Sequence, residues 1–514
     1  MFGSPSSASP LARVGVDERG GVAVIFALSL IPLLTLSGIA VDYSANTNVR
    51  RRAQDAVDAT ALSLAKLPSS LTDADLTDRA KRQVTSAMAG SQAVDLGVAL
   101  LRSGDTIKVT ATGTTPTTLT RMVGFTSLPL NVSGTSKRGS GNLEVALVLD
   151  NTGSMAGAKL ANLKAAAKDL VENLFDEVDP AKPNALKVAV VPFSMTVNVG
   201  ASHAGDAFID KDGLASYHSQ IFASKANRLT LFGKLGVAWG GCVEGRPMPY
   251  DVSETPATQG TPDSLFVPYF APDESDLDYY AVNDYLNDYS GNNGNNVKDD
   301  RVRQGQIAKY STSFKVSKFG RYGGSTGYLY GPHSGCELQP ITPLTTSQST
   351  VTSAISAMTV IGDTNIPLGL VWGWHALSPD GPLVKGAAYS DKTVRKFVVL
   401  MTDGQNQIAN TNSDNASYYS GTSYIWANRV GTVSSNSATR TAALDSRLST
   451  LCTNMKAAGI QIFTVRVEVA EGSNNLLQSC ATSPSMFFDV SDSGNLTAIF
   501  RAIGAQISEL RISR

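Results

Sequence analysis

The sequence has almost no net charge, few histidines and no recognisable catalytic motif. Its 514 residues include 43 Lys and Arg against 44 Asp and Glu, so no field of one sign draws the chain to nucleic acid or to an anionic membrane surface. The four histidines form no HExxH pattern, and neither a nucleophile elbow nor a P-loop is present. We therefore expect a protein that binds no nucleic acid and is not an enzyme.

Cysteines are also few, and none of them forms a CxxC pair. The four are Cys242, Cys336, Cys452 and Cys480. An even number without metal-ligand spacing is typical of structural disulfides in an oxidising compartment rather than of a zinc or redox site. Proximity in the sequence favours the pairs Cys242 to Cys336 and Cys452 to Cys480, and it follows that the bulk of the chain lies outside the cytoplasm.

One long hydrophobic run is present, near the N-terminus. Residues 20–41 carry no charged side chain, and at about 1.5 Å per residue a helix of this length crosses a hydrocarbon core of roughly 30 Å. A cleaved signal peptide, cut near Ala40, is the alternative. We favour a transmembrane helix over 20–41 that follows a cytoplasmic tail, 1–19.

Residues 42–140 are expected to form a stalk helix and a small α+β domain. Apolar residues recur at three- and four-residue steps from Val49 to Leu67, which continues the membrane helix outward. A second helix is expected around 74–88. Strands are expected at 105–111 and 128–136, where apolar residues alternate. A mere spacer is the alternative for this region.

From residue 141 to 514 the pattern predicts an α/β domain with a Rossmann-like, mostly parallel sheet. Apolar strands, which alternate with amphipathic helices, are expected at 143–149, 186–193, 397–401 and 460–469. The alternation stops over about 197–340, where Gly, Asn, Asp and Tyr are frequent, and we interpret this stretch as an insertion. Ten of the 16 tyrosines lie between Cys242 and Cys336. They suggest either a recognition surface or a loop-rich subdomain with tyrosines in its own core.

Oxygen-bearing side chains follow two of the expected strands. The segment DNTGS spans residues 150–154, directly after the strand 143–149, and Thr402-Asp403-Gly404 follows the strand 397–401. Open α/β sheets bind ligands at the carboxyl ends of their strands. Hydroxyl and carboxylate oxygens without histidine or thiolate suit magnesium rather than zinc. The alternative is that Ser154 only caps a helix and that the two aspartates lie in ordinary loops.

These motifs resemble the metal-ion-dependent adhesion site (MIDAS) of von Willebrand factor A domains, whose pattern is DxSxS with a separate threonine and a separate aspartate. The resemblance implies an A-domain fold. It also implies that Thr152 and Ser154 contact the metal and that Asp150 and Asp403 act largely through water. Thr364 best matches the separate threonine. The implied ion is Mg²⁺, or another divalent cation such as Mn²⁺ or Ca²⁺.

The N-terminus resembles the TadE-like and TadG-like components of tight-adherence (Flp) pilus assembly. The matching stretches are RGGVAVIF at 19–26, GIAVDY at 38–43 and the alanine-rich residues 52–61. One membrane helix joined to an A domain is the TadG-like arrangement. The fifth residue after Gly20 or Gly21 is not the glutamate of cleaved prepilins, so the resemblance implies an anchored component.

Together, these resemblances imply a component of the Flp/Tad pilus machinery in the bacterial cell membrane. It is expected to be single-pass, with a cytoplasmic N-terminus and a periplasmic or extracytoplasmic main domain. Its metal would bind an acidic residue of another pilus-assembly or envelope protein, in support of adherence and biofilm formation, and no small-molecule substrate is expected. A free-standing surface adhesin not tied to pilus assembly is the alternative, and a hydrolase is the third interpretation.

Overall fold

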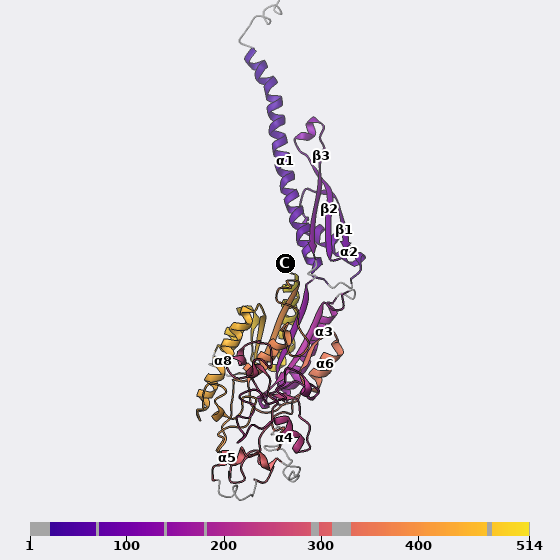
Figure 1. Cartoon of the computed structure of the whole chain (residues 1–514). Coiled ribbons are helices and arrows are strands. Elements are labelled where there is room, and N and C mark those ends of the chain that lie inside the picture. The colour runs from indigo at the N-terminus through magenta and orange to yellow at the C-terminus, as the bar shows by residue number, and fades with distance from the viewer. Residues whose placement is uncertain are drawn as a thin grey trace, which may run out of the picture. The chain divides into compact units, whose positions relative to one another are not determined.

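The computed structural model describes residues 21–67, 71–137, 141–178, 182–288, 298–310, 330–469 and 475–512. The chain forms two compact units, one up to residue 140 and one over 141–513 (Figure 1). The expected cytoplasmic tail, 1–19, lies outside the described residues.

The N-terminal unit begins with one long helix, α1 (Gly21–Ala65). Among the described residues, α1 is the one helix long and apolar enough to cross a membrane, and its apolar part is almost entirely exposed. Farther along, Ala53, Val57 and Leu64 are fully buried on one face of α1. The apolar run and the stalk are therefore one continuous helix, as the helical periodicity predicts.

A three-stranded antiparallel sheet packs against α1 and α2 (Asp73–Ala87). Its strands, in spatial order, are β1 (Val94–Ser103), β2 (Thr106–Pro116) and β3 (Ser127–Lys137). Glycine at 134 lets β3 lie close to α1, because a Cβ there would fall 2.7 Å from the Val57 carbonyl. The sequence analysis missed β1, which has no fully buried residue and exposes Leu101. Leu96, Val98 and Leu100 alternate on its half-buried face, but Ala99 and Leu101 on the exposed face hide this alternation in the sequence.

The C-terminal unit is built on a six-stranded sheet in the order β11-β10-β9-β4-β5-β8. Taken from the β8 edge and numbered along the chain, the strand order is 3-2-1-4-5-6, the doubly wound order. All neighbours are parallel except β8 with β5, so the predicted α/β fold class with a mostly parallel, Rossmann-like sheet is confirmed. The strands are β4 (Asn142–Asp150), β5 (Leu186–Phe193), β8 (Thr342–Thr345), β9 (Val394–Thr402), β10 (Gln461–Val467) and β11 (Phe487–Val490).

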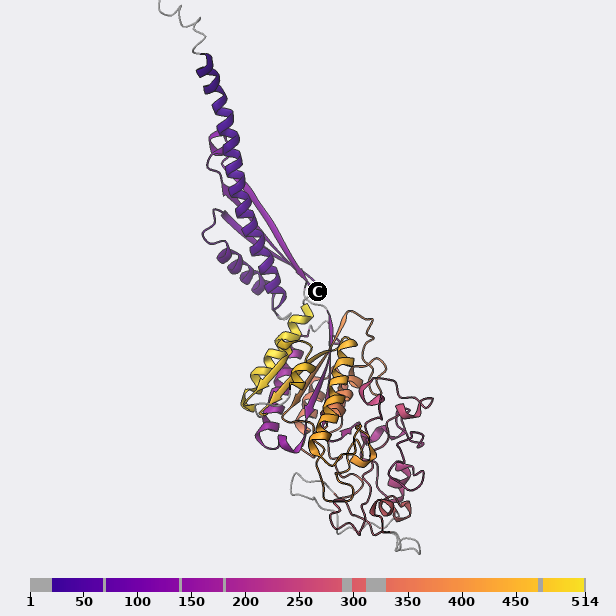
Figure 2. The same ribbon diagram turned by 90° about the vertical axis from the view of Figure 1, so that its left-hand side faces the viewer.

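Helices cover both faces of this sheet (Figure 2). One core contains Leu147 of β4 and the apolar sides of α3 (Ala158–Asp176), α6 (Gln348–Ala357) and α10 (Leu496–Ile512). The other core contains Val148, α7 (Ile366–Leu377) and α8 (Ser437–Ala457). Every residue of α7 is buried, and a Cβ at Gly373 would lie 2.5 Å from Val148 Cγ2. A glycine there lets α7 lie directly on the sheet.

The insertion packs onto the α7 face and shares its hydrophobic core. Its regular elements are short: β6 (Val197–Asn198), α4 (Arg228–Lys234), β7 (Cys242–Val243) and α5 (Asp300–Gln304). A disulfide joins Cys242 to Cys336 in this region, and a second joins Cys452 of α8 to Cys480 of α9 (Leu476–Cys480). Both pairs are those that proximity in the sequence favours.

The tyrosines of the insertion divide between core and surface. Tyr269, Tyr285 and Tyr310 are buried, as expected for a subdomain that uses tyrosines in its own core. Tyr279 is 90% exposed and Tyr280 53%. Tyr289, Tyr322 and Tyr328 lie outside the described residues.

Candidate metal centre

The candidate centre lies where β4 and β9 end side by side. Asp150 is the last residue of β4, Thr402 is the last of β9, and Asp403 follows. Asp150 is fully buried. Its Oδ2 accepts a hydrogen bond of 2.6 Å from the Thr402 hydroxyl, and its Oδ1 accepts one of 2.8 Å from the backbone N–H of Thr152. Both carboxylate oxygens are thus fixed by neighbours on the strand ends.

The hydroxyls of the DNTGS segment converge on the second aspartate. Thr152 Oγ1 and Ser154 Oγ are 2.9 Å apart, and Ser154 Oγ donates to Asp403 Oδ1 at 2.6 Å. Thr364 approaches from the loop that precedes α7. A Cβ built on Gly404 would lie 3.7 Å from Thr364 Oγ1 and 3.9 Å from Ser154 Oγ. The structure therefore brings together all five predicted site residues.

Backbone hydrogen bonds hold the Thr364 loop against the DNTGS segment. The Gly153 N–H donates to the Gly362 carbonyl at 3.0 Å, and the Ile361 N–H donates to the Asn151 carbonyl at 2.7 Å. Asn365, the residue after Thr364, caps α7 by accepting from the Leu368 N–H at 3.1 Å. The position of the Thr364 hydroxyl is thus determined by the backbone on both sides of it.

Burial sets the electrostatics of the centre. It raises the pKa of Asp150 to about 6, and the charge of Asp403 adds to this increase, although the hydrogen bonds from Thr402 and Thr152 oppose it. Burial also raises the pKa of Asp363, beside Thr364, to about 6. A cation beside such groups stabilises their ionised forms. The centre therefore favours positive charge.

The structure adds two charged residues that the sequence analysis missed. Lys159 Nζ, in the first turn of α3, donates to Asp403 Oδ2 at 2.7 Å and lies 3.7 Å from Glu468 Oε2. Glu468 directly follows β10 and thus meets the strand-end condition that identified Asp150 and Asp403. It was missed because the expected strand ran past it, to residue 469.

The donor set suits a hard divalent cation. Among the described residues no three His, Cys, Asp or Glu side chains gather as in a zinc or acidic calcium site. The site instead has three neutral hydroxyls and two carboxylates, which are oxygen ligands of the kind that Mg²⁺ prefers. Thr152 Oγ1 lies 2.9 Å from Ser154 Oγ, which itself lies 2.6 Å from Asp403 Oδ1. An ion at these side chains would compete with Lys159 for Asp403.

The N-terminal part of the chain matches a known family. Residues 20–65 match the family described as "Putative Flp pilus-assembly TadE/G-like". The N-terminal segment is TadE/G-like. The resemblance noted from the sequence is confirmed, and this TadE/G-like segment includes the whole of α1. No curated protein matches the chain.

Similar solved structures include pilus adhesins. The von Willebrand factor domain of the type V pili tip protein Mfa5 from Porphyromonas gingivalis is 12% identical, over 73% of this chain and 97% of that one, with a TM-score of 0.33. The pilus adhesin SpaC from Lactobacillus rhamnosus GG is 10% identical, over 81% of this chain, with a TM-score of 0.32. This chain covers 34% of the SpaC structure's own length, about a third of it.

A third similar structure is a proximal thread matrix protein from the mussel byssus, solved with a zinc-occupied MIDAS motif. It is 13% identical over 72% of this chain and 46% of that one, with a TM-score of 0.29. The chain therefore spans about half of that structure.

Proposed function

We propose that this protein is a membrane-anchored component of Flp pilus assembly that captures protein partners through a divalent metal ion. The TadE/G-like segment supports the link to pilus assembly, and the exposed apolar part of α1 supports a single-pass anchor. The binding role rests on one observation, the convergence of five oxygen-bearing side chains at the edge of the sheet. These are Asp150, Thr152, Ser154, Thr364 and Asp403.

The ligand set explains why a partner's carboxylate would complete the site. Thr152, Ser154 and Thr364 offer neutral hydroxyls, so only Asp150 and Asp403 offset the charge of the ion. Mg²⁺ seeks six oxygen ligands and usually keeps some waters. A remaining position is open to an acidic residue of another pilus-assembly or envelope protein. Mn²⁺ or Ca²⁺ accepts the same oxygen ligands, and the role is one of binding rather than catalysis.

The proposed organisation follows from the anchor and the disulfides. Residues 1–19 form a cytoplasmic tail, 20–41 the transmembrane part of α1, 42–140 the stalk and small α+β domain, and 141–514 the A domain. Both disulfides lie in the last of these, and disulfides persist outside the cytoplasm. The A domain would therefore meet its partners in the periplasm or at the cell surface, where it supports adherence and biofilm formation.

Removal of Asp150 tests the metal centre. We expect Asp150→Ala to lower the affinity for Mg²⁺ at least about tenfold in calorimetric titrations of the full chain in nanodiscs, a change of about 1.4 kcal/mol. The fold should persist, because the cores on both faces of the sheet hold it together. Asp169→Ala is the matched control, since Asp169 of α3 pairs with Arg501 of α10 and makes no contact with the centre's five residues in the described part of the chain. Equal Mg²⁺ binding by the wild type and Asp150→Ala would refute the site.

Pilus assembly and free-standing adhesion differ in the partners that they require. A component of the assembly system should co-purify with other proteins of that system in a Mg²⁺-dependent manner, and chelation should release them. A free-standing adhesin should purify without them. If the wild type and Asp150→Ala co-purify with the same proteins, the protein belongs to the assembly system but does not bind these partners through the metal centre.

A further inference from the structure

The loop between β2 and β3, residues 117–126, exposes three large apolar side chains. Leu119 is 45% exposed, Phe125 64% and Met122 87%. The same loop contains one cation, Arg121, and no acidic residue. Single exposed apolar residues are common on protein surfaces, but several gathered on one turn indicate a surface that something else covers.

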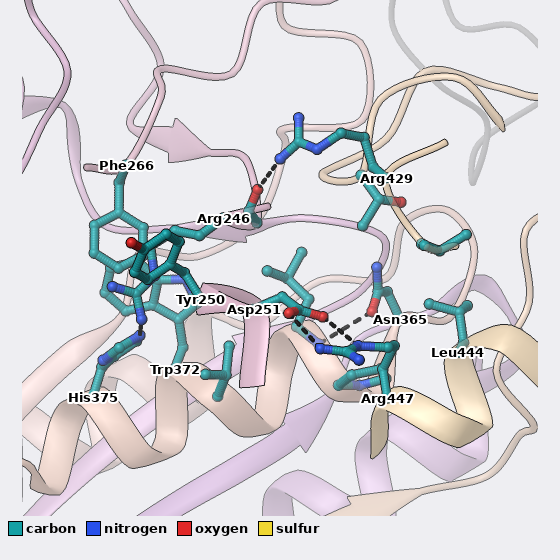
Figure 3. A pocket seen from close by; sticks show the side chains of 16 residues that line it. Arg246, Tyr250, Asp251, Phe266, Asn365, Trp372, His375, Arg429, Leu444 and Arg447 are labelled. Carbon is teal, nitrogen blue, oxygen red and sulfur yellow. Dashed lines mark hydrogen bonds and ion pairs between the residues drawn. The ribbon is translucent and has the colours of Figure 1, made fainter. Parts of the chain in front are cut away.

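By comparison, the apolar side chains around the cleft beside α7 are covered by the protein itself (Figure 3). Phe266, Trp372 and Leu444, which line this cleft, are at most 2% exposed. About 30 Å³ of free space remains in it, which is room for a water molecule or two. Arg447, in the same lining, pairs with Asp251 at 2.6 Å. The walls of the cleft are therefore complete without a partner, and those of the β2–β3 loop are not.

Hydrogen bonds within the β2–β3 loop fix its shape. The Met122 N–H donates to the Leu119 carbonyl at 3.2 Å. The Phe125 N–H donates to the Thr120 carbonyl, also at 3.2 Å. Between them Gly124 has a φ of +95°, a conformation that glycine adopts without strain. The exposed apolar side chains thus belong to a formed turn that presents them outward.

Asp42 of α1 holds this turn at the end of the apolar run. It is the first charged residue after residues 20–41 and is only 6% exposed. Its carboxylate accepts hydrogen bonds from the backbone N–H groups of Thr118, Leu119 and Thr120 at 3.0, 2.9 and 2.7 Å. The Thr120 hydroxyl donates to it as well, at 2.8 Å. These bonds fix the position of the loop along α1.

A glycine in the apolar run brings the loop still closer to α1. A Cβ built on Gly38 would lie 2.9 Å from Leu119 Cβ, and Figure 1 shows this end of the small sheet alongside α1. Gly38 stands three residues before Val41, the end of the run, which is a rise of about 4.5 Å. Leu119 therefore lies level with the last turn of the proposed transmembrane part of α1.

We propose that the β2–β3 loop inserts its tip into the extracytoplasmic interface of the membrane that α1 crosses. This inference rests on the anchor proposed above. Lipid is the occupant because the loop is hydrogen-bonded to α1 at the level where that helix leaves the hydrocarbon. Met122 and Phe125 enter the boundary between headgroups and acyl chains, and Arg121 extends to lipid phosphates. Attachment comes from α1, and the loop fixes the orientation of the small α+β domain against the bilayer.

Fluorescence quenching of the full chain in nanodiscs tests the proposal. The environment-sensitive fluorophore NBD is attached to Met122→Cys, since the four native cysteines are bonded in disulfides and do not react. We expect the emission to shift to the blue. Because interfacial elements enter only about 5–10 Å, lipids brominated near the glycerol should quench it at least about twofold more than lipids brominated near the methyl end.

Two further labelled positions separate this inference from the anchor. Leu101→Cys should show neither the shift nor the quenching, because Leu101 is as exposed as Phe125 but pairs with Lys108 of β2, about 26 Å from the loop. Leu30→Cys, in the middle of the apolar run, should be quenched most by lipids brominated near the methyl end. Quenching at Leu30→Cys but not at Met122→Cys overturns the loop insertion alone. Absence of quenching at both positions overturns the anchor as well.

A charged variant shows whether the fluorophore itself drives the insertion. Phe125→Asp in the labelled Met122→Cys chain should lower the quenching by at least about half, because a carboxylate resists transfer into lipid. Unchanged quenching would mean that the fluorophore inserts on its own, and it would overturn the proposal. A blue shift without quenching by either lipid also overturns it, because a protein surface, such as a second copy of the chain, would then cover the loop.

Discussion

Lys159 places an ammonium group against the carboxylate that a metal ion would approach. Its Nζ is 2.7 Å from Asp403 Oδ2, and the Asp403 side chain has no exposed surface. An ammonium group and a divalent ion at the same carboxylate repel each other, more strongly in a buried site than in water. Metal binding therefore requires Lys159 to leave Asp403, and Glu468, 3.7 Å away, offers it a second carboxylate.

Replacement of Lys159 should strengthen metal binding. Methionine has a similar length and no charge, so Lys159→Met should raise the Mg²⁺ affinity by about tenfold, or about 1.4 kcal/mol, in calorimetry. Lys164→Met is the control, because Lys164 lies on the same helix and donates to the Ser356 carbonyl away from the centre. An unchanged affinity in Lys159→Met would show that the ammonium group does not compete with the ion.

The sequence predicts which side chains meet at the candidate centre better than it predicts the charges around them. Asp150 and Asp403 are predictable because strand ends of a parallel sheet meet at one edge, whatever the loops do. The contact of Lys159 with Asp403 depends on how α3 begins after Gly157, which has a φ of +83°. Such a turn has no periodicity from which the direction of a side chain could be read.

At the scale of elements, burial on both faces decides which strands are predictable. All residues of β4 after Asn142 are buried, and residues 145–149 form a continuous apolar run between Glu144 and Asp150. In contrast, β11 is four residues long with one buried residue, and β8 has one as well. The insertion offers no pattern at all, because its core residues come from short segments far apart in the sequence.

The insertion contains a buried carboxylate, Glu274, that links its loops. Glu274 is fully buried. Its Oε2 accepts from the backbone N–H groups of Val282 and Asn283, at 2.6 and 3.2 Å, and its Oε1 accepts from the Tyr424 hydroxyl at 2.9 Å. Burial raises the pKa of Glu274 to about 7, although these hydrogen bonds oppose the increase.

This raised pKa predicts that stability falls as the pH increases. Unfolding returns Glu274 to a pKa near 4.3, so between about pH 4.5 and 7 the folded chain keeps a proton that the unfolded chain releases. The free energy of unfolding should therefore fall with rising pH by roughly 3 kcal/mol from this group alone. Glu274→Gln should remove that part of the decrease. Its amide oxygen can accept from the N–H groups of Val282 and Asn283, and its NH2 group can donate to the hydroxyl oxygen of Tyr424.

Urea titrations at pH 5 and pH 8, followed by tryptophan fluorescence, measure this difference. All four tryptophans, Trp239, Trp372, Trp374 and Trp426, belong to the C-terminal unit, so the signal reports that unit alone. The comparison between wild type and Glu274→Gln cancels the other titrating groups. The same pH dependence in both proteins would mean that Glu274 is not the carboxyl group responsible.

At the scale of the whole molecule, the two units differ in the surroundings that their side chains fit. The apolar part of α1 is exposed in the described residues, and its length and composition fit a helix that crosses a membrane. The C-terminal unit carries both disulfides and buries its cysteines. With a net charge of −1, the chain has no strong preference for an anionic membrane surface. The proposed attachment to the membrane therefore depends on α1.

The orientation of the chain follows if those disulfides form in the cell. Since thiols stay reduced in the cytoplasm, the C-terminal unit should lie outside it. We expect alkaline phosphatase fused after Arg514 to be active, and a β-galactosidase fusion at the same point to be inactive. Alkylation of intact cells without reductant should leave all four cysteines unlabelled, as controlled by labelling after reduction. The opposite reporter pattern would reverse the topology, and a soluble chain that starts at Val41 would show that the apolar segment is a cleaved signal peptide.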